Sequence, residues 1–300
     1  MRRVKIALPA TITNIGPCLG SLGLAFAMHA SVEITERKDD DLQVETLGEG
    51  AGRYSLGLQH PVVLGLMRLF QSLEKTVPGM NIRVDNHIPH GVGLGAEVTY
   101  LVAGIIGGNN MLGNPLTSEQ ALTLAATVTR RPDQVVTAIL GGLTTSLLDG
   151  ETLVYRSLPV ESLRAVVVVP EIEDYPIINT ERVPQRDALY NLSRAPMLLE
   201  GLRAGDHKLL GLTMEDRILS PMRKLYIPGY DEVVTAAKKQ GASAVTTSEN
   251  GPAMVVFAAD NHRRIALIIE EVFRERGITA RTWILPVDTQ GVVISVAQSG

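Results

Sequence analysis

The most informative stretch of the sequence is Ile88-Pro89-His90-Gly91-Val92-Gly93-Leu94-Gly95-Ala96-Glu97. Three glycines at alternate positions let the backbone turn sharply and bring its N–H groups close to a ligand. The mostly apolar residues 98–111 that follow are predicted to form a helix. Unpaired N–H donors and a partial positive charge at its first turn suit an anion such as phosphate. The spacing is that of neither a P-loop nor a dinucleotide-binding turn, and by itself it also fits a purely structural turn.

Hydrophobic periodicity around this stretch predicts a mixed α+β protein. Strands are expected at residues 4–8, 31–37, 42–46, 81–84 and 143–148, with a loop at residues 9–30. Helices are expected at residues 60–73, 98–111, 118–129 and 132–140. A buried strand restarts the pattern at residue 165, and the strand–turn–strand, helix, strand order beyond residue 244 predicts an antiparallel α/β sandwich. We therefore expect two domains, residues 1–155 and 156–300.

Composition limits the class of function. The 300 residues carry a net charge of -4 with a pI near 5.9, which provides no basic field for nucleic acid or an anionic membrane. One cysteine, Cys18, excludes an internal disulfide, and we interpret it as a small buried residue. Prolines and glycines interrupt the uncharged run at residues 6–32, so neither a secretory signal nor a membrane span is expected. A cytoplasmic protein is the expectation.

The glycine-rich stretch resembles the phosphate loop of the GHMP kinase superfamily, whose pattern is Pro-x-x-x-Gly-Leu-Gly-Ser-Ser-Ala. Other segments are similar to homoserine kinases and follow in that family's order: Pro9–Ala25, Leu112–Leu116, Pro132-Asp133, Asn191–Arg194, Ile227–Glu232 and Val287–Gly291. The resemblance covers nearly the whole chain. It implies a two-domain GHMP kinase fold, with an N-terminal nucleotide-binding α/β domain and a C-terminal ferredoxin-like antiparallel α/β sandwich.

The resemblance also implies an activity, transfer of the γ-phosphoryl group of ATP, with Mg²⁺, to the hydroxyl of homoserine or a related small metabolite. Homoserine kinases are often dimers, so a homodimer is expected by analogy. The implied nucleotide-binding residues are Pro89, Gly91, Gly93, Leu94, Gly95, Ala96 and Glu97. The implied substrate-binding residues are Asn14, Gly20, Arg131, Gln134, Arg182 and Arg217. Asp133 and Thr129 are the implied catalytic residues, with Glu97 and Thr129 as the implied metal ligands.

Several positions depart from the family's pattern at the expected site. Ala96-Glu97 replaces the Ser-Ser pair, and Thr129 stands where the family has its magnesium-binding glutamate. Arg131 and Gln134 replace a histidine and an asparagine. The turn Ser248-Glu249-Asn250-Gly251-Pro252 replaces Ser-Gly-Ala-Gly-Pro, and about four residues are missing from the substrate loop, of which Arg182 is interpreted as a remnant.

These departures leave two interpretations of Glu97. In one, its carboxylate caps the helix and repels a triphosphate, which predicts an inactive pseudokinase that binds a metabolite or a partner. In the other, Glu97 and Thr129 exchange the family's hydroxyl and carboxylate, so that oxygen ligands for magnesium are retained. Arg130 and Arg131 likewise have two interpretations, contact with phosphates or an acidic substrate, or a solvated helix end.

Overall fold

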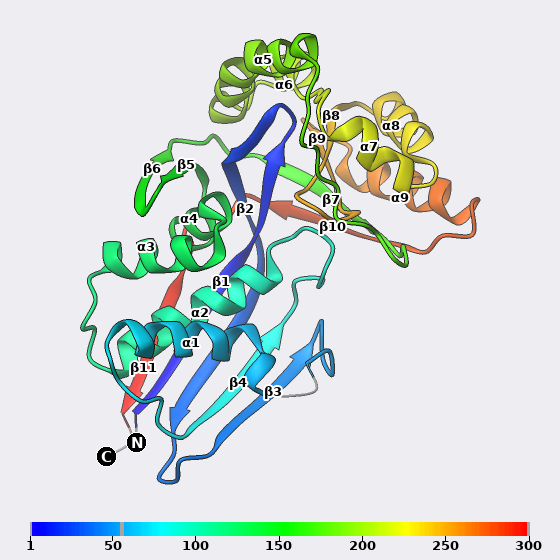
Figure 1. Ribbon diagram of the computed structural model, residues 1–300. Helices are drawn as coiled ribbons and strands as arrows, with labels where there is room; N and C mark the ends of the chain where they lie inside the picture. Colours follow the sequence, from blue (N-terminus) through cyan, green and yellow to red (C-terminus); the bar gives the residue numbers. More distant parts are fainter. Residues whose placement is uncertain (1, 55–56, 299–300) are drawn as a thin grey trace.

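The computed structural model describes residues 2–54 and 57–298, and these residues form two sheets with helices packed on them (Figure 1). The first part of the chain supplies β1 (Arg2–Ile15), β2 (Cys18–Glu36), β3 (Leu42–Gly48), α1 (Pro61–Ser72), β4 (Met80–Asn86), α2 (Ala96–Met111), α3 (Ser118–Thr129), α4 (Pro132–Leu140), β5 (Leu143–Asp149) and β6 (Thr152–Leu158). The sheet has the order β11-β1-β2-β4-β3, with β5 paired to β2 and β6 paired to β5. Its described neighbours are antiparallel except β3 and β4.

The two longest strands, β1 and β2, form one antiparallel hairpin that turns at Gly16 and Pro17. The loop expected at residues 9–30 is therefore wrong. Consecutive residues 8–13 of β1 are buried, so both faces of this part of the hairpin are covered, and this burial outweighs the turn-forming composition. A shift in register after Pro9 accommodates the residue that has no N–H to donate to the ladder.

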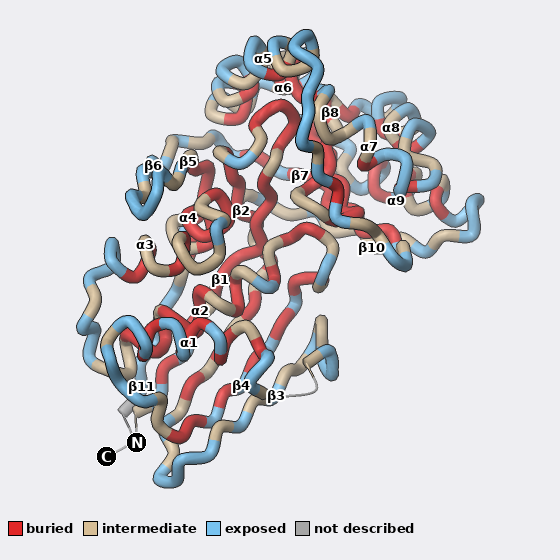
Figure 2. Tube along the Cα trace, viewed as in Figure 1, coloured by how far each residue is buried: buried red, intermediate tan, exposed pale blue. Residues whose placement is uncertain are grey.

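Helices cover one face of this sheet in two layers. The helices α2 and α4 lie on β1 and β2, whereas α1 packs on α2 and α3 packs on α4. Figure 2 shows buried stretches in α2, α4, β1 and β2, the elements that meet where the helices pack on the sheet. Both inner helices begin beside β1, α2 near Thr11 and α4 near Thr13. The fold therefore brings two helix N-termini to the same strand.

The rest of the chain supplies β7 (Arg164–Pro170), α5 (Gln185–Ala204), α6 (His207–Thr213), α7 (Ser220–Arg223), α8 (Tyr230–Lys239), β8 (Ala242–Thr247), β9 (Met254–Ala258), α9 (His262–Arg274), β10 (Ala280–Pro286) and β11 (Val293–Gln298). The second sheet is antiparallel with the order β10-β7-β9-β8. In chain order this arrangement is 4-1-3-2, the ferredoxin-like order that was predicted. The expected mixed α+β class is confirmed.

The continuous apolar run of β7 is explained by burial on both of its faces. Val167 and Val169 belong to the core that extends into the first sheet, whereas Val166 and Val168 pack in a second core under α8 and α9. Side chains of a strand alternate between faces, so β7 contributes to both cores at once. The two parts of the molecule thus share an apolar junction.

The last strand returns to the first sheet, since β11 pairs with β1 along its length. The boundary predicted between residues 155 and 156 falls inside β6, and the nearest connection outside the two sheets is at residues 159–163. The division of the chain into two consecutive segments stays a prediction. In the structure, β11 belongs by sequence to the second segment but lies in the first sheet. Among the described residues, no helix is long and apolar enough to cross a membrane.

Candidate active site

The glycine-rich loop connects β4 to α2 and is held from two sides. On one side, the N–H of Thr11 in β1 donates to the carbonyl of Leu94 at 3.1 Å. On the other, the Ser248 hydroxyl donates to the carbonyl of Gly93 at 2.6 Å, and the N–H of Ala253 donates to the carbonyl of Val92 at 3.1 Å. The first sheet and the β8–β9 turn together fix the backbone of the loop.

Two of the glycines are required by space as well as by conformation. Gly93 and Gly95 have φ angles of 90° and 80°, in the left-handed region. A Cβ atom on Gly95 would overlap the hydroxyl of Thr11, and one on Gly93 would overlap the carbonyl oxygen of Ser248. Gly95 is also the N-cap of α2 and has no side chain to satisfy the helix donors. The N–H groups at the start of α2 are therefore left for water or a ligand.

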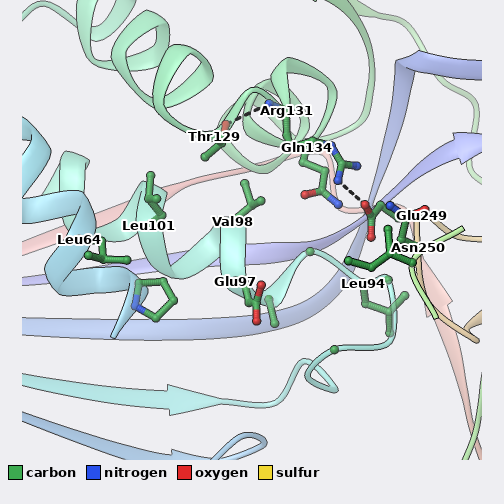
Figure 3. A pocket seen from close by; sticks show the side chains of 16 residues that line it. Leu64, Leu94, Glu97, Val98, Leu101, Thr129, Arg131, Gln134, Glu249 and Asn250 are labelled. Carbon is green, nitrogen blue, oxygen red and sulfur yellow. Dashed lines mark hydrogen bonds and ion pairs between the residues drawn. The ribbon is translucent and has the colours of Figure 1, made fainter. Parts of the chain in front are cut away.

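A cavity of about 520 Å³ lies along this loop and the first turns of α2. Most of the predicted nucleotide-binding and metal-binding residues line it: Gly91, Gly93, Leu94, Gly95, Ala96, Glu97 and Thr129, together with the predicted substrate residues Arg131 and Gln134. Pro89 is buried and does not line the cavity. Apolar side chains, Pro61, Leu64 and Leu101, line another part of the cavity. Figure 3 shows these side chains around the start of α2.

The Glu97 carboxylate makes none of the capping hydrogen bonds that one interpretation predicts, within residues 2–54 and 57–298. It accepts a hydrogen bond from the Tyr54 hydroxyl at 3.4 Å and lies 3.6 Å from Nε2 of His90. Burial lowers the pKa of His90 and so favours the neutral imidazole, while the charge of Glu97 acts in the opposite direction. With 59% of its side chain exposed, Glu97 presents its carboxylate at the cavity.

Thr129 ends α3, and its hydroxyl is already occupied. The hydroxyl donates to the carbonyl of Ala125 at 2.8 Å and accepts from the N–H of Arg131 at 3.2 Å. One acceptor position remains on this oxygen. Thr129 and Glu97 line the same cavity, as the exchange of metal ligands requires, but Glu97 has the more accessible oxygen atoms, with 59% of its side chain exposed.

A second cavity, of about 290 Å³, adjoins the first. The predicted residues Asn14, Gly20 and Asp133 line it. Asn14 has a left-handed φ of 53°, and its side-chain oxygen accepts from the N–H of Gly20 at 2.7 Å, which fixes the β1–β2 turn at this cavity. Four residues line both cavities and so form the wall between them: Arg131, Ile177, Glu249 and Asn250.

Asp133 is the only carboxylate among the predicted substrate and catalytic residues. It is almost completely buried, with 2% of its surface exposed. It lies in the first turn of α4, and Nε of Arg131 is 3.6 Å from its Oδ1. Its Oδ2 is buried and has no hydrogen-bond partner among the described residues. Burial raises the pKa of Asp133 above its usual range, and the charge of Arg131 opposes this effect. An unpaired oxygen of this kind can take a hydrogen bond from a substrate hydroxyl.

Two predicted substrate residues lie elsewhere. Arg182 is exposed and lines neither cavity. The guanidinium of Arg217 stacks on the ring of Tyr190, with 3.6 Å from Cζ to the ring centroid, and its Nε lies 3.3 Å from Glu215. These contacts hold Arg217 away from Asn14 and Asp133, at a separate surface hollow.

Arg223, for which the sequence predicts no role, is only 1% exposed. Its N–H bonds to the carbonyl of Leu219, a residue that lines the second cavity. Nη1 donates to the hydroxyl of Thr247 at 3.3 Å, while Nε and Nη2 are buried without partners among the described residues. Arg217 and Arg223 are six positions apart, and no local pattern distinguishes the buried arginine from the exposed one.

Known proteins resemble this chain over its whole length. Residues 62–142 match the sequence profile of the GHMP kinases N terminal domain, and residues 198–279 match that of the GHMP kinases C terminal. A homoserine kinase of Carboxydothermus hydrogenoformans is 30% identical over 99% of this chain and 98% of its own length. A homoserine kinase of Moorella thermoacetica is 31% identical, over 96% and 99%.

The fold is also similar to that of a homoserine kinase of known structure. The crystal structure of a homoserine kinase from Cytophaga hutchinsonii superposes with a TM-score of 0.86 over 98% of this chain and 97% of its own, at 24% sequence identity. The glycine-rich loop, the two adjoining cavities and the full-length similarity agree with one another. The chain therefore belongs to the homoserine kinases of the GHMP kinase superfamily.

Proposed function

We propose that this protein is an ATP-dependent kinase that phosphorylates the hydroxyl of homoserine or of a closely related small amino alcohol. The observation that supports this activity is the pair of adjoining cavities with a shared wall. One cavity has the glycine-rich loop and a helix N-terminus, and the other has a buried carboxylate. Phosphoryl transfer needs donor and acceptor held side by side, which this arrangement provides.

The first cavity fits ATP in size and polarity. Its apolar part, between Pro61, Leu64 and Leu101, suits the purine ring. The loop N–H groups and the start of α2 suit the phosphates. Pro61 has no N–H to offer, so the base would be held by apolar contact more than by hydrogen bonds to this segment.

The second cavity fits a small polar acceptor. Asp133 would accept the hydrogen bond of the acceptor hydroxyl through its unpaired Oδ2, and Asn14 lies in the same cavity. Arg223 is bonded through its N–H to the carbonyl of Leu219, which lines this cavity, but Arg223 itself lines neither cavity. A hydroxyl of the acceptor would satisfy the Asp133 oxygen, which otherwise stays buried without a partner among the described residues.

The transfer step can then be written in full. A bond forms between the acceptor oxygen and the γ-phosphorus, and the bond from the γ-phosphorus to the bridging oxygen breaks, which releases ADP. The hydroxyl proton passes to Asp133, whose pKa is raised by burial and which is therefore a better base than an exposed aspartate.

Magnesium fits this site through Glu97. One carboxylate together with phosphate oxygens and water is a usual environment for Mg²⁺, and Glu97 offers an accessible carboxylate. Thr129 contributes at most its remaining acceptor position. When bound, the ion would neutralise charge on the phosphates.

The test is turnover with purified protein, ATP, Mg²⁺ and homoserine, serine, threonine or hydroxybutyrate as acceptor. ADP formation and the mass of the phosphorylated product are measured, with Asp133→Asn as the variant. We expect phosphorylation of an acceptor that carries a carboxylate, and a loss on the order of 10²–10⁴-fold in kcat for Asp133→Asn. Nucleotide binding without turnover of any acceptor, or no nucleotide binding, would instead support the pseudokinase.

A further inference from the structure

The wall between the two cavities contains one cation and one anion, Arg131 and Glu249. If the nucleotide occupies the first cavity and the acceptor the second, the transferring phosphoryl group must pass this wall. Charge at this place would act directly on the charge of the transferring phosphoryl group.

Arg131 holds three partners with its guanidinium. Nη1 is hydrogen-bonded to the Glu249 carboxylate, Nη2 donates to the hydroxyl of Thr13 at 3.4 Å, and Nε lies 3.6 Å from Asp133. Figure 3 shows Arg131 and Glu249 pointing toward one another at the cavity. The guanidinium thus lies between the cavity proposed for the nucleotide and Asp133, the carboxylate proposed to bind the acceptor.

Glu249 is placed under constraint. Its φ of 46° is in the left-handed region, where its counterpart in the family's Ser-Gly-Ala-Gly-Pro pattern is glycine. Its N–H donates to the carbonyl of Thr13 at 3.1 Å, and only 14% of its side chain is exposed. A glutamate with a left-handed backbone and a largely buried carboxylate is unfavourable unless a cation neutralises it, and Arg131 is the cation that does so.

We propose that Arg131 binds the transferring phosphoryl group, and that Glu249 holds the guanidinium in position until the γ-phosphate of the nucleotide takes its place. Carboxylate and phosphate offer the same paired oxygen geometry to a guanidinium, and phosphate carries more charge. Arg131 also compensates for Thr129, which supplies no carboxylate to a metal ion. This inference rests on the proposed kinase function.

The experiment compares dissociation constants for ATP and ADP, measured by titration calorimetry with Mg²⁺. For Arg131→Gln we expect ATP binding to weaken about 10-fold or more, because a charge-assisted hydrogen bond to the γ-phosphate is lost. ADP has no γ-phosphate, so its dissociation constant should change much less. For Glu249→Gln, ATP binding should strengthen, by up to about 10-fold, since the competing carboxylate is gone.

Turnover gives a second readout on the same variants. Arg131→Gln should lower kcat on the order of 10²–10³-fold. Arg131→Lys keeps the charge but loses the planar guanidinium, so its kcat should lie between those of the wild type and Arg131→Gln. The matched control is Arg203→Gln, which removes the arginine of an exposed ion pair with Glu200. It should leave both dissociation constants and kcat unchanged.

Equal weakening of ATP and ADP in Arg131→Gln would overturn the inference, because it would indicate a structural role. Weaker ATP binding in Glu249→Gln would also overturn it. The proposed kinase function survives either result provided that the wild-type protein turns over an acceptor. A wild-type protein that binds no nucleotide overturns both.

Discussion

Glu97 is the residue at which this chain departs furthest from the phosphate-binding pattern of its family. We expect the Glu97→Ser variant to lose the Mg²⁺-dependence of ATP binding, because the accessible carboxylate is the residue best placed to hold the ion. The measurement is calorimetric titration of ATP with Mg²⁺ and with EDTA. Glu119→Ser is the control, since Glu119 is likewise in the first turn of a helix but lines neither cavity. Mg²⁺-dependent ATP binding gained in the variant and absent in the wild type would refute the role of Glu97.

Gly95 gives a second prediction at this scale. Replacement by alanine should destabilise the protein by about 2–4 kcal/mol, the sum of a left-handed alanine and an overlap with the Thr11 hydroxyl. Gly113→Ala is the matched control: its φ of 83° is equally left-handed, but a Cβ there meets no atom within 4 Å. It should cost only about 1 kcal/mol. Urea unfolding of the two variants compares them directly, and equal losses would show that the overlap at Gly95 is relieved by local movement.

Single residues also mark the limit of what the sequence could predict about the site. The glycine-rich loop is local, so its conformation and its ligand class follow from consecutive residues. The contact between Arg131 and Glu249 joins residues 118 positions apart, and only the assembled fold brings them together. The same is true of Arg223, whose burial against Thr247 depends on the packing of α7 on β8.

At the scale of elements, α1 is capped by a histidine that cannot easily be protonated. Nδ1 of His60 accepts the N–H of Val62 at 3.2 Å, and Nε2 lies 3.0 Å from the Thr46 hydroxyl. Burial, with a smaller contribution from the charge of His90, lowers the pKa of His60 to about 4. In the unfolded chain the pKa of this histidine is near 6.5. Between pH 6.5 and 4 the unfolded state therefore binds a proton that the folded state does not.

The free energy of unfolding should therefore be fully retained above pH 6.5 and fall as the pH decreases from 6.5 toward 4, by up to about 3 kcal/mol from this residue. The variant His60→Asn keeps an acceptor at the N-cap but does not titrate. The measurement is urea unfolding of both proteins at several pH values. The difference between them should shrink as the pH falls, and a constant difference would show that His60 does not carry the effect.

The elements themselves were predictable where burial and local signals agree. The helix starting at Ser118 has a capping box formed by Thr117 and Gln120, and α4 begins with Pro132, so both were placed correctly. The β1–β2 hairpin was not, because its glycines and prolines are typical of loops and its strand pairing is set by burial against α2 and α4.

At the scale of the whole molecule, the first sheet is complete only with the last strand. A fragment of residues 1–160 lacks β11, leaving the edge of β1 unpaired, and we expect it to aggregate or to unfold without a cooperative transition. The same fragment joined through a flexible Gly-Ser linker to residues 287–300 should regain a cooperative unfolding transition. Gel filtration and thermal unfolding followed by circular dichroism test this pair, and cooperative unfolding of the shorter fragment would show that β11 is dispensable.

The pairing of Arg2 with Gln298 has a further consequence for how the protein is made. On the ribosome, β1 emerges long before β11, so the edge of β1 that β11 covers stays open until β11 has been made. Contacts between such distant residues form slowly, because the entropy cost of closing a long loop comes before the favourable contacts form. The interval in which β1 offers an unpaired edge is when this chain is most exposed to misassembly, and when a chaperone would have most effect.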